Sequence, residues 1–267
     1  MDALPDHSAD RAPLDQAALA AELPPGWQLS VVPETGSTNA DLIAAAGRGA
    51  PGRTARVAEL QTAGRGRLDR GWQSPTGAGL TVSVLLRPPV PPTSWGWLPL
   101  LAGLALCRAI GDRAELKWPN DVLMGPEQAK VAGILGESTG EAVVLGMGIN
   151  VSTTAAELPV PTASSLALQG VVLSRGRLLV ELLTGLEAVL SRWYATDGDA
   201  VLAGLAEEYR ARSATIGSRV RVQLPDGVVA GLATSVDDSG RLVITPDDGE
   251  SFAVAAGDVT HLRPAAG

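Results

Sequence analysis

The hydrophobic pattern of this chain changes character near residue 213, and the change limits what the chain can fold into. From Trp27 to about Tyr209, short β-branched or alternating segments bounded by Gly or Pro interleave with helix-like segments. After Ser213 only short strand-like segments remain, separated by PDG, DDSG and PDDG turns. The pattern predicts an α+β fold in which a mixed sheet is backed by helices, followed by a small all-β unit.

The larger part is predicted to contain six strands and three helices. The strongest helix signal is an apolar period of 3.6 residues that follows a Ser174 cap and ends at Trp193. The other two helices are expected at 39–46 and 98–110. The strands are expected at 28–32, 54–60, 80–86, 114–118, 131–136 and 142–149.

The two ends of the chain give different signals. Five short strands at 219–224, 228–235, 241–245, 251–254 and 259–262 predict an SH3-like barrel. Residues 1–26 are expected to be a flexible tail with one short helix within 14–23, and this is too short for a DNA-binding unit, since a minimal domain needs about 55 to 65 residues. We therefore expect a tail at 1–26, a main domain at 27–212 and an SH3-like domain at 213–267.

Composition excludes several classes of function. The formal charge of -8 and the pI of about 4.8 argue against general binding to nucleic acid, which draws its affinity from excess Lys and Arg. The single Cys107 lies in an apolar run and indicates a core thiol in a reducing compartment. The start of the chain lacks the apolar core of a signal peptide, and no apolar run approaches the roughly 18 to 20 residues of a membrane span. We expect a cytoplasmic protein that binds neither DNA nor membranes.

Histidine chemistry is also excluded as the main mechanism. The two histidines, His7 and His261, lie near opposite ends of the chain and are too few for a metal site or a Ser/His triad. The remaining possibility is chemistry performed by positioning and by positive charge.

Lysine and asparagine are rare, and the few present fall into short motifs. There are two lysines, Lys117 and Lys130, beside nineteen arginines, and three asparagines. A guanidinium does not replace a compact ammonium where a point charge must enter a tight site, so the retained lysines indicate an anion-binding site. The motifs are GSTN with Asn39, KWPND with Lys117 and Asn120, KVAGILGE with Lys130, and GMGIN with Asn150.

The loop QTAGRGRLDRGW from Gln61 to Trp72 carries three arginines among three glycines. Glycine lets backbone amides point into one concavity, and guanidinium groups bind phosphate or carboxylate oxygens with two parallel hydrogen bonds. The loop is therefore interpreted as an anion cradle, with a solvated Gly/Arg turn as the alternative. It is not a Walker A motif, because no Gly-Lys pair exists.

The other motifs each allow two interpretations. In KWPND, Lys117 is suited to phosphates and Asp121 to a metal ion, but a strand end followed by an Asn-Asp turn uses the same residues. Lys130 begins an apolar strand and is placed to reach a carboxylate or phosphate, or it is an exposed lysine. In GSTN, Ser37 and Asn39 suit either a helix cap or the polar head of a small ligand. Asn150 in GMGIN is either a turn residue or a contact to metal or phosphate.

In this order and spacing, the motifs resemble those of the biotin protein ligase family. The resemblance runs from about Val31 to Val151, and the C-terminal all-β segment is similar to the terminal domain of that family. The form that it resembles lacks an N-terminal DNA-binding domain. The resemblance implies a class II synthetase-like catalytic domain of the biotin and lipoate ligases.

The resemblance also implies a two-step reaction. Biotin and ATP would form biotinyl-5′-AMP with Mg²⁺ present, and a lysine of a biotin carboxyl carrier domain would then take the biotinyl group. The protein would be a monomer or a weak homodimer. A lipoate or octanoate ligase or transferase is the alternative enzyme, and a biotin sensor without catalysis is the alternative binding protein.

The resemblance assigns roles to individual residues. Lys130 and Arg67 would be catalytic, and Asp121 would contact the metal. Asp69 departs from the family pattern, which usually has Gly there, and it adds a negative charge beside the expected phosphates. The biotin site would consist of Ser37, Thr38, Asn39, Gln61, Arg65, Gly66, Arg67 and Lys130, and the ATP or adenylate site of Arg65, Arg67, Arg70, Trp72, Lys117, Asn120 and Asn150.

Overall fold

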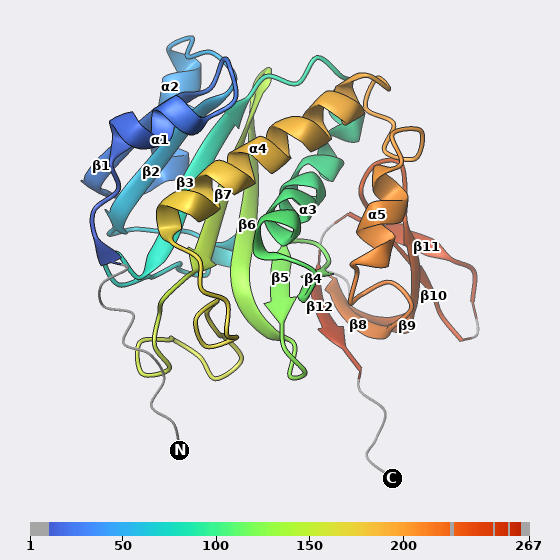
Figure 1. The fold of residues 1–267 in the computed structure, drawn as a ribbon. Helices are drawn as coiled ribbons and strands as arrows, with labels where there is room; N and C mark the ends of the chain where they lie inside the picture. The colour runs from blue at the N-terminus through green and yellow to red at the C-terminus, as the bar shows by residue number, and fades with distance from the viewer. Residues whose placement is uncertain (1–10, 225–226, 248, 256, 263–267) are drawn as a thin grey trace.

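The computed structural model describes residues 11–224, 227–247, 249–255 and 257–262, which form two sheets with helices around the larger one (Figure 1). The larger sheet is mixed, because β1 and β2 are parallel and every other neighbouring pair is antiparallel. Its order is β1-β2-β3-β7-β6-β5-β4. The strands are β1 (Gln28–Thr35), β2 (Thr54–Gln61), β3 (Gly79–Leu86), β4 (Ala114–Lys117), β5 (Asp121–Met124), β6 (Ala129–Thr139) and β7 (Ala142–Asn150).

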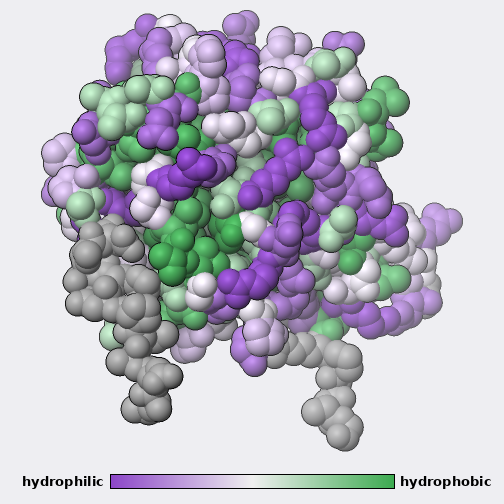
Figure 2. Space-filling model, viewed as in Figure 1, coloured by the Kyte–Doolittle hydropathy of each residue, from purple (hydrophilic) through white to green (hydrophobic). Residues whose placement is uncertain are grey.

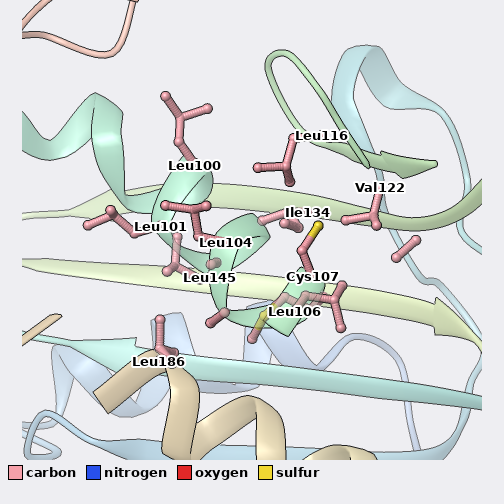
Figure 3. Packing of buried hydrophobic residues seen from close by; sticks show 14 of the residues in the cluster. Leu100, Leu101, Leu104, Leu106, Cys107, Leu116, Val122, Ile134, Leu145 and Leu186 are labelled. Atoms are coloured by element: carbon pink, nitrogen blue, oxygen red, sulfur yellow. The ribbon is translucent and has the colours of Figure 1, made fainter. Parts of the chain in front are cut away.

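The two faces of this sheet have different partners. Helices α3 (Leu98–Ile110) and α4 (Arg175–Tyr194) cover one face, and their leucines pack with side chains of the sheet (Figure 3). Helix α2 (Thr38–Gly47) covers part of the other face, where Leu42 packs with Leu85 and Val144. Because successive side chains of a strand point to opposite faces, Val82 and Val84 of β3 point into the large core, and Thr81 and Ser83 point away from it.

Helix α4 has the one-sided pattern that the sequence predicts. Ser174 caps its N-terminus by accepting a hydrogen bond from Arg177 N, and Leu186 and Trp193 are fully buried. Charged and polar side chains follow the course of this helix on the outer surface (Figure 2). The predicted cap and apolar period are both confirmed.

The smaller sheet is antiparallel and confirms the predicted C-terminal all-β unit. The turn between β9 (Gly227–Val236) and β10 (Leu242–Thr245) meets the part of the chain that carries the larger sheet, since Trp97 Nε1 donates to Asp237 O and Trp118 Nε1 donates to Gly240 O, both at 3.0 Å. Helix α5 (Leu205–Ala211) precedes this sheet. The strands are β8 (Arg219–Leu224), β9 (Gly227–Val236), β10 (Leu242–Thr245), β11 (Phe252–Val254) and β12 (Asp258–His261), in the order β11-β10-β9-β8-β12.

The segment before β1 is ordered by specific contacts. The short helix expected there is α1 (Gln16–Glu22), which Asp15 caps by accepting from Ala17 N and Ala18 N. Leu19 is buried in the main core, and a buried arginine donates to Ala12 O. Residues 11–26 are therefore held in place, whereas the sequence predicts a flexible tail there. The composition of the segment does not reveal the contacts that order it. Residues 1–10 lie outside the described residues.

Strand β5 (Asp121–Met124) and helix α5 (Leu205–Ala211) were not predicted from the sequence. KWPND is a tight connection between β4 and β5, in which Asp121 opens a strand opposite Lys117 instead of completing an Asn-Asp turn. Strand β5 pairs with β6 as a hairpin across the short connection 125–128. No helix within the described ranges is long and apolar enough to cross a membrane.

Candidate functional site

A cavity of about 1170 Å³ lies on the face of the large sheet that α3 and α4 leave uncovered. It is bounded by the start of α2, the loop between β2 and β3, the β4–β5 connection and strand β12. The cavity brings together all the predicted site residues. These are Ser37, Thr38, Asn39, Gln61, Arg65, Gly66, Arg67, Arg70, Trp72, Lys117, Asn120, Asp121, Lys130 and Asn150.

Glycines of the sheet form the floor of the cavity and leave room for the side chains that pack on them. In the sheet, Gly148 lies opposite Gly133 on β6 and Thr81 on β3. A Cβ at Gly148 would collide with the Trp72 ring, and a Cβ at Gly146 would collide with the Asn39 side chain. The GMGIN motif therefore serves close approach of other side chains to the sheet.

One end of the cavity is a network of uncharged polar groups. Ser37 caps α2 by accepting from Ala40 N, so the next residues turn inward at the start of the helix. Thr38 donates through N and Oγ1 to Gln61 Oε1 at 2.8 and 2.9 Å. Asn39 is 4% exposed and its Oδ1 accepts from Ser83 Oγ at 2.5 Å.

Two members of this network were missed by sequence reasoning. Ser83 touches both Thr38 Oγ1 and Asn39, and Glu137 Oε2 accepts from Asn39 Nδ2 at 2.7 Å. A signal for Ser83 was present, because Thr81 and Ser83 are polar residues at alternate positions of an apolar strand. Glu137 is the last residue of the KVAGILGE motif, but no role was assigned to it from the sequence, because its bond to Asn39 depends on how α2 packs on β6.

The arginine loop closes over the cavity as a small antiparallel turn. Gly66 N donates to Arg70 O, and Trp72 N donates to Gly64 O at 2.9 Å. Arg65 lies 3.4 Å from Glu137 Oε1, and Arg67 Nη1 donates to Asn120 Oδ1 at 3.4 Å. The loop thus brings guanidinium groups to the pocket from the side opposite the sheet. The side chain of Asp69 lies outside the described part of the structure.

Trp72 covers the glycine floor. Its indole packs on Gly148 and Gly133, and the ammonium of Lys130 lies 6.0 Å from the ring centroid. Trp72 Nε1 is buried and has no hydrogen-bond acceptor among the described residues. A buried N–H without an acceptor is costly, so this donor is a candidate contact for a bound molecule.

Two charged residues meet where β5 and β6 pair. Lys130 Nζ lies 2.6 Å from Asp121 Oδ1, and the two side chains are 35% and 20% exposed. Lys130 is only partly exposed, and its ammonium pairs with Asp121 and lies beside the Trp72 ring and Gly133. Asn120 supports this corner by donating through Nδ2 to Ile134 O at 3.1 Å.

The wall beside Lys130 comes from a segment that sequence reasoning left unassigned. Residues 159–163 line the cavity, and Lys130 N donates to Thr162 O at 2.9 Å. Asn150 is 5% exposed and holds the same segment through a 2.9 Å bond from Nδ2 to Ser164 O. In this structure Asn150 therefore supports the wall with its side-chain amide.

The C-terminal sheet also reaches the cavity. His261 of β12 lines it, and its Nε2 lies 3.0 Å from Thr215 Oγ1, which accepts from Trp118 N at 3.0 Å. Burial, and then the positive charge of Lys117, lower the pKa of His261. The sequence argument excluded both histidines from a triad or a metal site and did not place His261 here. His7 lies outside the described residues.

The charge distribution limits what the cavity can bind. One end is lined by uncharged polar side chains, with the Arg65–Glu137 pair beside Asn39, the middle is glycine and indole, and the remaining side gathers Arg67, Lys117 and Lys130. This suits a small molecule with a polar uncharged head, an apolar chain and an acidic end, together with a polyphosphate. The described residues contain no group of three or more His, Cys, Asp or Glu that would hold a metal by themselves.

Comparisons with known proteins match this geometry to one family. The Biotin/lipoate A/B protein ligase family matches residues 38–153, and the Biotin protein ligase C terminal domain matches residues 215–262. A biotin–[acetyl-CoA-carboxylase] ligase of Mycobacterium tuberculosis is 46% identical, over 97% of this chain and 99% of that protein. One of Paracoccus denitrificans is 32% identical, over 83% of this chain and 96% of that protein.

Solved structures agree with the sequence matches. The biotin protein ligase of Aquifex aeolicus in complex with biotin and ATP aligns with a TM-score of 0.72 and 27% identity. The alignment covers 89% of this chain and 99% of that one. This chain therefore belongs to the biotin protein ligases of the biotin/lipoate A/B protein ligase family.

Proposed function

We propose that this protein activates biotin with ATP and transfers it to a lysine of a biotin carboxyl carrier domain. In the first step, a carboxylate oxygen of biotin attacks the α-phosphorus of ATP, pyrophosphate leaves, and biotinyl-5′-AMP forms. In the second step, the ε-amine of the carrier lysine attacks the acyl carbon, AMP leaves, and the amine loses a proton. Both steps need charge placement more than a histidine base.

The observation that carries the proposal is the order of chemical environments along one cavity. The uncharged network of Ser37, Thr38, Asn39 and Gln61 suits a ureido ring, which offers N–H donors and one carbonyl acceptor. The floor of glycine and Trp72 suits the apolar ring and chain. The cations at the far end suit the carboxylate and the phosphates of ATP.

The proposed roles at the charged end follow from position. Lys130 neutralises charge on the biotin carboxylate and on the α-phosphate, because it stands at the edge of the floor on which the chain would lie. Arg65, Gly66 and Arg67 hold the adenylate from the loop side, and Trp72 lies against it. The ATP site is completed by Arg70, Lys117, Asn120 and Asn150.

Magnesium fits this site only as a companion of ATP. Asp121 is the carboxylate at the β4–β5 connection, and its Oδ1 already pairs with Lys130. Mg²⁺ is commonly held by substrate phosphates, water and one or two carboxylates, and this agrees with Asp121 as a single protein ligand. When bound, the ion supplies positive charge to the triphosphate.

The remaining parts of the proposal concern partners and context. The acceptor would be the carrier domain of a biotin-dependent carboxylase, and the protein would act in the cytoplasm as a monomer or a weak homodimer without binding DNA. We propose residues 27–212 as the catalytic domain and 213–267 as the SH3-like domain. Sedimentation over a range of protein concentrations tests the oligomeric state.

Calorimetric titration separates the proposed function from its alternatives. Biotin, lipoate and octanoate are each titrated with and without MgATP, and pyrophosphate release is followed in parallel. The proposal expects biotin binding and pyrophosphate release that depends on biotin. Release with lipoate or octanoate but not with biotin would instead assign the alternative enzyme. Biotin binding without pyrophosphate release would instead indicate a biotin sensor without catalysis.

A further inference from the structure

An ion pair between Arg11 and Glu157, here called the clasp, lies outside the cavity beside the wall at 159–163. Arg11 donates to both carboxylate oxygens of Glu157, at 2.9 Å through Nη1 and 2.8 Å through Nη2. Nη2 also donates to Ser152 O at 2.9 Å. These bonds join positions more than 140 residues apart, and the two side chains are 25% and 30% exposed.

The core fixes the position from which Arg11 acts. Arg175 of α4 is 2% exposed, and it donates to Ala12 O and to Glu59 Oε2, both at 2.6 Å. Glu59 Oε1 in turn accepts from Leu14 N at 2.7 Å. The Arg175–Glu59 ion pair therefore fixes the backbone at Ala12 and Leu14, and this restricts where the Arg11 side chain can lie.

The clasp and the cavity share one continuous loop. Glu157 Oε2 accepts from Thr154 N and Thr154 Oγ1 as well as from Arg11, so the carboxylate closes a turn in this loop. Two residues further on, the loop enters the cavity wall at 159–163, where Thr162 O accepts from Lys130 N. The hydrogen bond from Arg11 holds the pKa of Glu157 at about 2, so the carboxylate is charged throughout the neutral range.

We propose that Arg11 is a positioning residue for the nucleotide half of the pocket, acting through Glu157 on the wall at 159–163. The inference rests on the proposed function, since it assumes that ATP lies beside Lys130 and Asn150. The biotin half is built on α2 and β3, whose polar side chains take no part in the hydrogen bonds of Arg11, although the backbone of Arg11 packs on Gly77 just before β3. Loss of the clasp therefore weakens ATP binding and leaves biotin binding unchanged.

The test compares Arg11→Ala with a matched variant elsewhere. Arg53 makes the same kind of two-bond pair with Glu187 of α4, at 2.7 and 2.8 Å, and neither residue lines the cavity. Arg53→Ala therefore removes a comparable ion pair without reaching the wall. Arg11→Ala removes three hydrogen bonds to the loop, and we expect it to raise the KM for ATP about ten-fold with a smaller change in kcat. We expect Arg53→Ala to lower the Tm without changing that KM.

A double-mutant cycle and a conservative variant distinguish positioning from general stability. Glu157→Gln should raise the KM for ATP as Arg11→Ala does, and the double variant should be little worse than either, because both remove one interaction. Arg11→Lys should restore part of the affinity, since an ammonium makes one bond where the guanidinium makes two. Additive effects of the two substitutions would overturn the pairing.

Direct binding keeps this inference separate from the proposed reaction. α,β-Methylene ATP, which cannot be cleaved between its α- and β-phosphates, is titrated into each variant, and biotin is titrated separately. The inference expects weaker nucleotide binding for Arg11→Ala and equal biotin binding. It is overturned if nucleotide affinity stays within two-fold of the unsubstituted protein while the Tm falls as it does for Arg53→Ala. If the unsubstituted protein binds the nucleotide but releases no pyrophosphate with biotin, the proposed function fails, and the clasp is still tested.

Discussion

At the scale of single residues, Lys130 carries a partly buried ammonium held beside Asp121, Trp72 and Gly133. Its ammonium lies 2.6 Å from Asp121 Oδ1, and an added Cβ at Gly133 would come within 3.1 Å of it. The chain has only one other lysine, Lys117, so the ammonium here is a specific choice over arginine. A compact cation fits between the floor, the indole and the carboxylate, whereas a planar guanidinium is larger and has fixed donor directions.

Lys130→Ala should slow pyrophosphate release by about 10² to 10³, because one well-placed cation at developing charge is commonly worth that factor. Lys130→Arg should recover little of the rate. The measurement is single-turnover formation of biotinyl-5′-AMP, with Arg177→Ala as the control, since that change removes an exposed cation from α4. Near-normal adenylate formation in Lys130→Ala would refute the role given to this lysine.

Arg67 supports a prediction about retention of the intermediate. Its guanidinium bridges the loop to Asn120, so Arg67→Gly should open the loop and release biotinyl-5′-AMP. The leaked adenylate should label an added bystander protein, whereas the variant itself should be labelled little, because its only side-chain amines are Lys117 and Lys130 in the pocket. Mass spectrometry after long incubation provides the measurement. Heavy biotinylation of either lysine would contradict its placement.

At the scale of elements, local sequence patterns predicted most helices and strands. How these elements pack and pair with one another could not be predicted from the patterns. Short runs of apolar residues predicted β3 and β7, and a Ser cap with an apolar period of 3.6 residues predicted α4. Burial of one face of an element makes apolar residues recur at a fixed spacing in the sequence. Strand β5 and the short helix α5 were not found, because four to seven residues give too little periodicity. The short motifs predicted many of the residues that line the cavity, since most of these motifs lie where a helix or strand begins or ends. The wall at 159–163 was missed because only its backbone bonds to Lys130 bring it to the cavity. Glu137 was given no role because its bond to Asn39 joins two elements distant in sequence.

His261 of β12, which lies near Lys117 of β4, predicts how the free energy of unfolding changes with pH. Burial and Lys117 lower the pKa of His261 in the folded protein, so the unfolded chain takes up a proton near pH 6.5 before the folded protein does. This group therefore reduces the free energy of unfolding as pH falls below about 6.5. Urea unfolding at pH 7.5 and 5.5 should show a smaller loss for His261→Gln than for the unsubstituted protein. Equal losses would mean that His261 titrates alike in both states.

At the scale of the whole molecule, three regions distant in sequence meet at one cavity. The large sheet supplies the floor, the C-terminal sheet supplies His261, and the clasp at Arg11 holds the wall at 159–163. The C-terminal sheet is joined to KWPND by three bonds around Trp118 and Thr215. We infer that the two domains act as one catalytic unit, because the cavity lining includes residues from both.

Transfer to a carrier domain tests the central claim most directly. The protein is incubated with a carboxylase carrier domain, MgATP and either biotin or lipoate, and the carrier is examined by mass spectrometry. A carrier variant with its acceptor lysine changed to arginine serves as the control. The account predicts one biotinyl group on that lysine, formed only with biotin and MgATP and absent from the control. An unmodified carrier with biotin, or modification by lipoate instead, would contradict it.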